Sequence, residues 1–402
     1  MTSFWEAIEP IVLRVWETKS ITGLFILVTA VALILAATFF RYRLTESTRQ
    51  LVKRGSLLLV VILGVMHVWS FAWLGDDAFI SFRYSQNFAE GHGLVFNHGE
   101  WVEGYTNFLW TFILGGLHYL GLSIPHTALL LNIASFVGVI LIAHAIVTRW
   151  LNTSMVLPSW TSILLAGCSP FAIYGTSGLE TMSGALCVIA GVAMTLKGRY
   201  RIGGLFFVLG AMMRPDHILF WGCMGLALAF DDLVSRSGHV LKRLDWRRYV
   251  AFTLPLVLVY VPFFAFRWWL YGDMFPNTYY AKSGNLTYFS QGVRYLGVFL
   301  GTTGGYVWLP LFLLALVFGS KDRQSIVLRV FSILSVLIFG TYVCKVGGGF
   351  MENRFLLVLL PIVFVTIELW ARPLLNEEPR KVFLFAGVAL LFTAVVTRVE
   401  VV

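Results

Sequence analysis

The run HTALLLNIASFVGVILIAHAIVT, residues 126–148, decides the fold class of this chain. It contains no Lys, Arg, Asp or Glu, and it exceeds the roughly 20 apolar residues that an α-helix needs to cross a bilayer. Over all 402 residues, 58% are hydrophobic and 13% are charged, against about 25% charged residues in soluble domains. This composition excludes an ordinary cytosolic enzyme, a disordered protein and a nucleic-acid binder, although the net charge is +9. We therefore expect an all-α integral membrane protein, because a helix satisfies its own backbone hydrogen bonds in lipid.

Apolar runs of similar length recur along the chain and predict about 12 spans in a single membrane domain, residues 1–402. The other predicted spans are residues 21–40, 55–74, 159–175, 179–197, 201–213, 217–231, 249–269, 302–319, 327–345, 354–371 and 381–398. The first lacks a small-residue cleavage site and is expected to be a retained anchor rather than a signal peptide. Residues 106–120 would place the later basic loops on the wrong side if they crossed the membrane, and they number only 15. They are therefore expected to form an interfacial or re-entrant helix on the outer side.

The distribution of Lys and Arg predicts the orientation. Twenty of the 30 cations lie in loops that these spans place on one side, which the positive-inside rule assigns to the cytoplasm. Two polar segments then lie outside the membrane, residues 75–125 and residues 270–301.

No metal site is predicted, because the four cysteines lack ligand spacing and His92 and His98 lack a third ligand.

The first outer segment carries most of the polar chemistry. It contains GDDAFISFRYSQNFAEGHGLVFNHGEWVEGYTNFLW, residues 75–110. Asp76 and Asp77 end a span, and such a pair suits a general base or a cation site, although a solvated helix end has the same pattern. Arg83 follows one or two helical turns later and could hold an anion or only pair with these carboxylates.

Further charged residues recur at the same predicted depth, and ionisable residues near apolar spans are functional candidates by default. Glu180 lies in SGLET, and Arg214 and Asp216 lie in MMRPDH, where the alternative is a snorkelling arginine at a helix break. The motif YGDMFPNTYYAK, residues 271–282, could be an interfacial aromatic belt. A belt does not explain its polar side chains, Asp273, Asn277 and Lys282. Four outer cations could together form a phosphate site: Arg214, Lys282, Arg294 and Arg354.

In this order, the motifs DDAFISFRYSQN, GHGLVFN with VEGYTNFLW, SGLET, RPD, YGD with PNT and YAK, and a final GG before RF resemble a known family. The set is similar to the bacterial GT-C membrane glycosyltransferases. Within them it most resembles the branch containing the terminal β-(1→2)-arabinofuranosyltransferases and the pilin or envelope arabinosyltransferases. The resemblance covers residues 74–361 and implies a GT-C multi-span helical bundle with interfacial helices on its outer face.

The resemblance implies transfer of one sugar, with arabinofuranose favoured, from a polyprenyl phosphate to an acceptor outside the membrane. The acceptor would be an envelope glycan or a protein such as pilin, and the enzyme would lie in the bacterial inner membrane with its active site on the periplasmic face. Asp76 or Asp77 would be the catalytic base, with Asp76 favoured. The expected donor- or acceptor-binding residues are Arg83, Tyr84, Glu103, Tyr105, Asn107, Glu180, Arg214, Asp216, Asp273, Asn277, Lys282, Arg294 and Arg354. The resemblance implies no firm cofactor, and a divalent cation is compatible but not required.

Two departures from the family pattern and two rival functions stay open. Gly349 stands where the family often has an acidic residue, and the chain lacks the soluble carbohydrate-binding domain that mycobacterial members carry, so the acceptor is open. A lipid or sugar transporter or flippase is the alternative from another class, but it would place ionisable residues near the midplane, often within inverted repeats. A non-catalytic envelope scaffold would leave the cluster of polar motifs unexplained.

Overall fold

The computed structural model describes residues 45–151, 158–235, 244–282, 287–349, 351 and 353–375, and these residues form helices and loops without a strand. The predicted spans at residues 21–40 and 381–398 lie outside this part of the chain. In order, the helices are α2 (Glu46–Ser70), α3 (Asp76–Ala89), α4 (Phe108–Tyr119), α5 (Ile124–Leu151), α6 (Trp160–Gly167), α7 (Ser169–Ala172), α8 (Thr181–Leu196), α9 (Tyr200–Met213), α10 (Ile218–Ser235), α12 (Trp246–Pro255), α13 (Val261–Tyr271), α14 (Asn277–Lys282), α15 (Phe289–Thr302), α16 (Gly305–Phe318), α17 (Arg323–Leu334), α18 (Gly340–Val346) and α19 (Leu359–Leu375).

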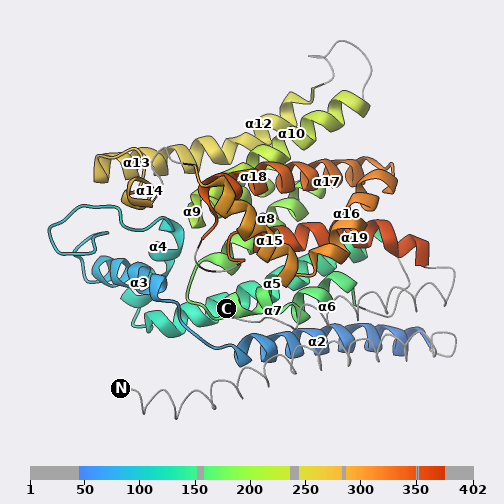
Figure 1. Ribbon diagram of the computed structural model, residues 1–402, viewed down its shortest axis with the longest axis horizontal. Helices are drawn as coiled ribbons and strands as arrows, with labels where there is room; N and C mark the ends of the chain where they lie inside the picture. Colours follow the sequence, from blue (N-terminus) through green and yellow to red (C-terminus); the bar gives the residue numbers. More distant parts are fainter. Residues whose placement is uncertain are drawn as a thin grey trace.

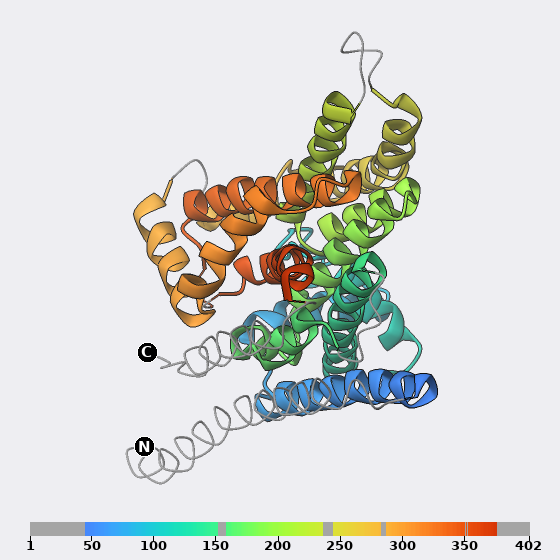
Figure 2. The ribbon, with the colours of Figure 1, turned by 90° about the vertical axis from the view of Figure 1, so that its right-hand side faces the viewer.

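The interior of the bundle is apolar and is built around α8 and α19. Nearly every residue of α8 is buried, and α19 runs through the middle of the molecule in Figure 2, with its first eight residues all buried. A small residue lets α8 approach α9 closely: a Cβ at Gly191 of α8 would lie 2.9 Å from the ring of Phe207 on α9. Close approach over small side chains is the usual way that helices associate in a membrane.

Among the described residues, four helices are long and apolar enough to cross a membrane: Ile124–Arg149, Pro215–Val234, Trp246–Tyr271 and Arg323–Val346. α15 and α16 would together make a fifth, but they meet at 93°. Five more apolar helices have 10–17 residues, including α4, α8 and α9. The short helix expected at residues 106–120 is present as α4.

Two predicted spans differ in the structure. Residues 159–175 do not form one helix, because the chain extends at Cys168 (ψ 104°) and Pro170 begins the short helix α7. Residues 302–319 contain a sharp turn at Gly304, whose φ of 69° is left-handed, so that only α16 occupies this stretch. Apolar composition does not distinguish a straight span from one that is broken by such local backbone geometry.

The two predicted faces of the protein lie at opposite ends of the bundle. α3, α4, α13 and α14 gather at the left end in Figure 1, and the C-terminal end of α10 and the turn between α16 and α17 lie at the right end. At the right end Gln324 donates a hydrogen bond to the Leu196 carbonyl (3.2 Å). Arg248 and Arg323 meet the buried carboxylate of Asp231 there, at 3.0 and 2.7 Å. Three of the predicted cytoplasmic loops therefore come together.

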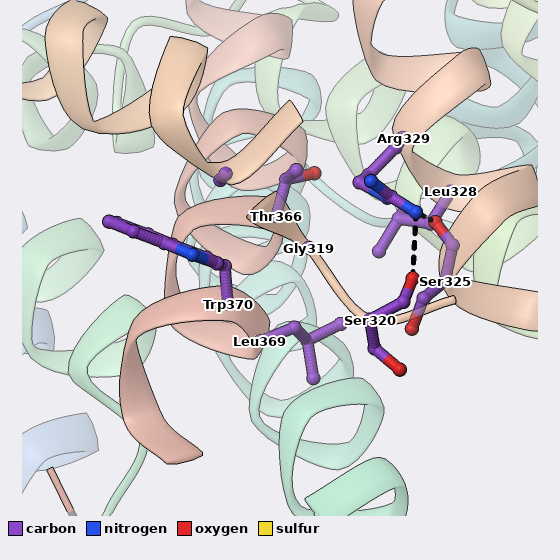
Figure 3. Close-up of a pocket in the computed structure, with 9 residues that line it drawn as sticks. Gly319, Ser320, Ser325, Leu328, Arg329, Thr366, Leu369 and Trp370 are labelled. Carbon is purple, nitrogen blue, oxygen red and sulfur yellow. Dashed lines mark hydrogen bonds between the residues drawn. The ribbon is translucent and has the colours of Figure 1, made fainter. Parts of the chain in front are cut away.

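A small cavity also opens at the right end, between α16, α17 and α19 (Figure 3). The guanidinium of Arg329 lies beside it and donates hydrogen bonds to the carbonyls of Leu316 (2.8 Å) and Ser320 (2.7 Å). These carbonyls lie at the C-terminal end of α16, where helix carbonyls lack intrahelical partners. Arg329 is therefore a helix cap, and the cavity lies at the end of the bundle opposite to the candidate site.

Candidate active site

The first outer segment and the SGLET turn are joined at the left end of the bundle. The Gly75 amide donates to the Ser177 carbonyl (2.9 Å), and the Trp110 indole donates to the Gly178 carbonyl (3.0 Å). Gly178 has a left-handed φ of 76°, and a Cβ there would lie 3.0 Å from that of Ala78. Only glycine fits both conditions, and the turn is thereby fixed against α3 and α4.

Glu180 follows this turn and is the centre of a buried charged cluster. One carboxylate oxygen, Oε1, accepts from Arg354 (2.8 Å) and from Arg214 (3.3 Å). The other, Oε2, accepts from the amide of Asn107 (2.8 Å), whose own oxygen accepts from the Ser81 hydroxyl (3.0 Å). The Glu180 side chain is 4% exposed. These contacts bring residues from four distant motifs to one point.

Arg214 is bound on all sides within this cluster. Its Nε and one terminal nitrogen form a two-point contact with Asp216 (3.1 and 2.7 Å), and its guanidinium lies 4.5 Å from the ring centre of Phe355. A Cβ at Gly184 would approach the Arg214 side chain and lie 2.7 Å from the His217 ring. Arg214 therefore does not extend to the surface, as the snorkelling alternative required.

Asp76 and Asp77 occupy different surroundings, although both begin α3. The Asp77 carboxylate lies 3.7 Å from Arg354, whereas Asp76 is exposed and accepts the Asp77 amide (2.8 Å). Arg354 is held less completely than Arg214. Apart from Glu180, it meets the Thr181 hydroxyl at 3.3 Å and the Met351 sulfur at 3.6 Å. Asp77 and Arg354 are thus the members of the cluster with the most capacity for a substrate.

A second cluster joins the two outer segments. Both oxygens of Glu103 accept from Nε of Arg267 (3.0 and 2.9 Å), and both side chains are buried. The Tyr84 hydroxyl donates to the Val102 carbonyl (2.7 Å), and the Tyr105 hydroxyl lies 3.1 Å from that of Tyr271. Glu103, Tyr84 and Tyr105 therefore belong to this second cluster rather than to the group around Glu180.

Of the remaining predicted residues, Asp273 and Asn277 adjoin the second cluster through their backbone groups. Arg83 donates to the Phe96 carbonyl (3.2 Å). Asp273 and Asn277 are exposed, and the side chain of Lys282 lies outside the described residues. Arg294 is exposed and has no hydrogen bond or ion pair with the described part of the chain. Of the four cations predicted to form a phosphate site, Arg214 and Arg354 lie together in the described part of the chain.

Sequence reasoning missed Arg267, although a usable signal was present. It is the single charged residue in the predicted span at residues 249–269, and an ionisable residue inside an apolar run is a functional candidate. Among the described residues, no group of three or more His, Cys, Asp or Glu side chains is arranged to hold a metal ion.

The all-α fold of this chain is similar to that of a solved structure. The crystal structure of ArnT from Cupriavidus metallidurans bound to undecaprenyl phosphate superposes with a TM-score of 0.57 at 15% identity, covering 85% of this chain and 62% of that chain. The fold class predicted from the sequence is confirmed.

The particular relatives are terminal β-(1→2)-arabinofuranosyltransferases. The chain is 28% identical over 354 residues to that of Mycobacterium tuberculosis, covering 76% of this chain and 53% of the relative. It is 26% identical over 353 residues to that of Corynebacterium glutamicum, covering 75% and 49%. The chain thus spans about half the length of these relatives, and no family model matches it. The resemblance inferred from the motifs is confirmed.

Proposed function

We propose that this protein transfers a single sugar, with arabinofuranose favoured, from a polyprenyl phosphate to an acceptor outside the cytoplasmic membrane. The observation that carries the proposal is the cluster of Asp77, Glu180, Arg354, Arg214 and Asp216 at the end of the bundle where both outer segments meet. The names of the relatives support the sugar, and the ligand in the ArnT structure supports the donor class. The comparisons contain nothing that favours a transporter or a flippase.

The proposed reaction needs one base and one group that stabilises a leaving phosphate. An oxygen of the acceptor attacks the anomeric carbon of the sugar, the bond from that carbon to the phosphate oxygen breaks, and the acceptor proton passes to Asp77. Arg354 then meets the phosphate, whose negative charge grows as it departs. An arginine suits this role, because its planar guanidinium can hold two phosphate oxygens at once.

The buried carboxylates give Arg354 a defined resting position. Two arginines, Arg214 and Arg354, face three carboxylates in the cluster, so these side chains carry no excess of positive charge. An arriving phosphate must therefore compete with Asp77 for Arg354, and the 3.7 Å contact between these two is the longest ion pair of the cluster. Donor binding would release Asp77 for the acceptor. The active site would lie on the periplasmic face of a bacterial inner membrane.

The test is direct transfer by the purified full chain. Synthetic polyprenyl-phosphate donors carrying arabinofuranose, a hexose or an aminosugar are incubated with envelope glycan or pilin acceptors, and products are identified by mass spectrometry. We expect release of polyprenyl phosphate and a product larger by one pentose, and Asp77→Asn serves as the inactive control. Absence of transfer with every donor, together with movement of labelled lipid across proteoliposomes, would instead support the flippase.

A further inference from the structure

Glu103 and Arg267 are saturated by each other and by backbone groups. Nε of Arg267 contacts both oxygens of Glu103, and its two terminal nitrogens donate to the Met274 carbonyl (2.9 and 2.7 Å) and to the Asp273 carbonyl (3.3 Å). The Glu103 side chain is 5% exposed and that of Arg267 is 8% exposed. Little capacity remains on either group for a substrate.

Each partner is fixed to a different outer segment. The Tyr84 hydroxyl on α3 accepts from the Gly104 amide (2.9 Å) and donates to the Val102 carbonyl, which anchors the backbone on both sides of Glu103. A Cβ at Gly104 would lie 2.8 Å from that hydroxyl, so the approach depends on glycine. Arg267, through its carbonyl contacts, holds the turn that leads into α14. The ion pair therefore joins the first outer segment to the turn before α14, which are 164 residues apart in the sequence.

α14 is attached to the Glu103–Arg267 pair by a backbone hydrogen bond. The amide of Asn277, its first residue, donates to the Glu103 carbonyl (2.9 Å). The same outer segment reaches the central cluster four residues after Glu103, where the side-chain amide of Asn107 donates to Oε2 of Glu180 (2.8 Å). One short stretch of chain thus links the Glu103–Arg267 pair to the central cluster.

We propose that Glu103 and Arg267 are a positioning pair, which holds α14 against the first outer segment and so fixes the wall of the active site from which Asn107 reaches Glu180. This assignment moves Glu103 from a substrate-binding to a positioning role, and it rests on the proposed function only where activity is concerned. A wall displaced by about 1 Å is enough to change the kinetics of a site by up to about 10²-fold.

The test uses hydrogen–deuterium exchange on the purified full chain, which needs no knowledge of the sugar. Arg267→Lys keeps the positive charge but loses the planar guanidinium, and Glu103→Ala removes the carboxylate that accepts the hydrogen bonds. In both variants we expect peptides covering residues 99–105 and 273–282 to exchange about tenfold faster or more. Glu103→Gln keeps an oxygen for Arg267 and should exchange more slowly than Glu103→Ala. Arg294→Gln, at an exposed cation without a partner in the described chain, is the matched control and should behave as wild type.

Two results would overturn the pairing role. The first is unchanged exchange of residues 273–282 in Arg267→Lys and in Glu103→Ala. The second is equally faster exchange in α8, which would mean that the pair only supports global stability. If the protein transfers sugar, the two variants should also raise the donor KM about tenfold while kcat per folded molecule changes less. If the variants exchange faster but the wild-type protein shows no transferase activity, the positioning role of the pair stands and only the proposed function is refuted.

Discussion

Asp76 and Asp77 are adjacent in sequence, but they point to different surroundings. As α3 begins, the first carboxylate turns to solvent and accepts its neighbour's amide, while the second faces Arg354. The family resemblance implied an acidic base at the start of the first outer segment, with Asp76 favoured over Asp77. The structure favours Asp77, because it alone of the two has a contact with the central cluster.

We therefore expect Asp77→Asn to lower kcat by about 10²-fold or more, the usual contribution of a general base. Asp76→Asn should lower kcat far less, because the exposed carboxylate only accepts a backbone amide. Turnover of both variants is measured with the same polyprenyl-phosphate donor, and circular dichroism checks folding. A large loss in Asp76→Asn with an active Asp77→Asn would reverse the assignment.

The two arginines of the cluster should respond differently to substitution. Arg354→Lys is expected to raise donor KM by about tenfold or more, because an ammonium group cannot replace a two-point phosphate contact. Arg214→Lys should instead lower thermal stability, since its guanidinium satisfies Asp216 and Glu180, and a buried charge without its partner is costly. Donor kinetics and melting temperature are measured on the same samples. A raised KM in Arg214→Lys with unchanged stability would exchange the two roles.

Glu103 gives the protein a pH dependence of its own. Burial raises the pKa of Glu103 from its ordinary value of 4.5 to about 7, Arg267 lowers it in part, and Asp273 raises it. The Tyr84 hydroxyl is a further titratable group near Glu103. The folded state therefore holds this proton more tightly than the unfolded chain. The contribution to stability is complete below the unfolded pKa and is lost as the pH rises through the folded pKa.

The melting temperature of the wild type should accordingly fall between about pH 5 and pH 7.5 more steeply than that of Glu103→Gln, whose amide does not titrate. Infrared difference spectra of the two proteins should show one carboxyl band that disappears near pH 7 only in the wild type. Parallel melting curves across this range would exclude a raised pKa at this position.

At the scale of elements, close backbone approach controls how the helices meet. A Cβ at Gly204 of α9 would lie 2.1 Å from the Phe252 carbonyl oxygen of α12, so even a methyl group would force the two helices apart. Gly222 of α10 offers a matched comparison, because nothing lies within 4 Å of its Cβ position.

Gly204→Ala should therefore destabilise the fold by about 1–3 kcal/mol, the usual range for overpacking. Gly222→Ala should be neutral or stabilising by up to about 1 kcal/mol, because alanine favours a helix. Thermal unfolding in one detergent measures both. Equal melting temperatures for the two variants would show that α9 and α12 do not touch as closely as described.

At the scale of the whole molecule, the orientation in the membrane remains a prediction that the fold makes testable. Glu100 is exposed near the candidate site, Lys197 is exposed at the opposite end, and all four native cysteines are buried. In intact cells Glu100→Cys should react with an impermeant thiol reagent, and Lys197→Cys should react only after the membrane is opened. Labelling of Lys197→Cys from outside would place the candidate site in the cytoplasm.

The sequence by itself determined the class of molecule. Apolar runs long enough to span a bilayer have few alternatives to helices, and the polar motifs between them carried the family resemblance. Composition could not determine where the spans break, because the breaks near residues 168 and 304 depend on single backbone conformations. The motif pattern also could not assign the polar residues to two separate clusters.

Only the tertiary structure decided that division. Glu180 and Glu103 both lie in polar motifs of the outer face, yet one meets Arg214 and Arg354 and the other meets Arg267, which the sequence analysis had counted as part of a span. A buried carboxylate must find a partner cation, and the sequence fixes that requirement without fixing the partner. The partner is selected by packing. Gly178 lets its turn lie against α3, Gly184 leaves room for the His217 ring, and the first residue of α14 donates a hydrogen bond to the Glu103 carbonyl. These contacts join residues far apart in the chain, which is why local patterns contain the chemistry of the site but not its arrangement.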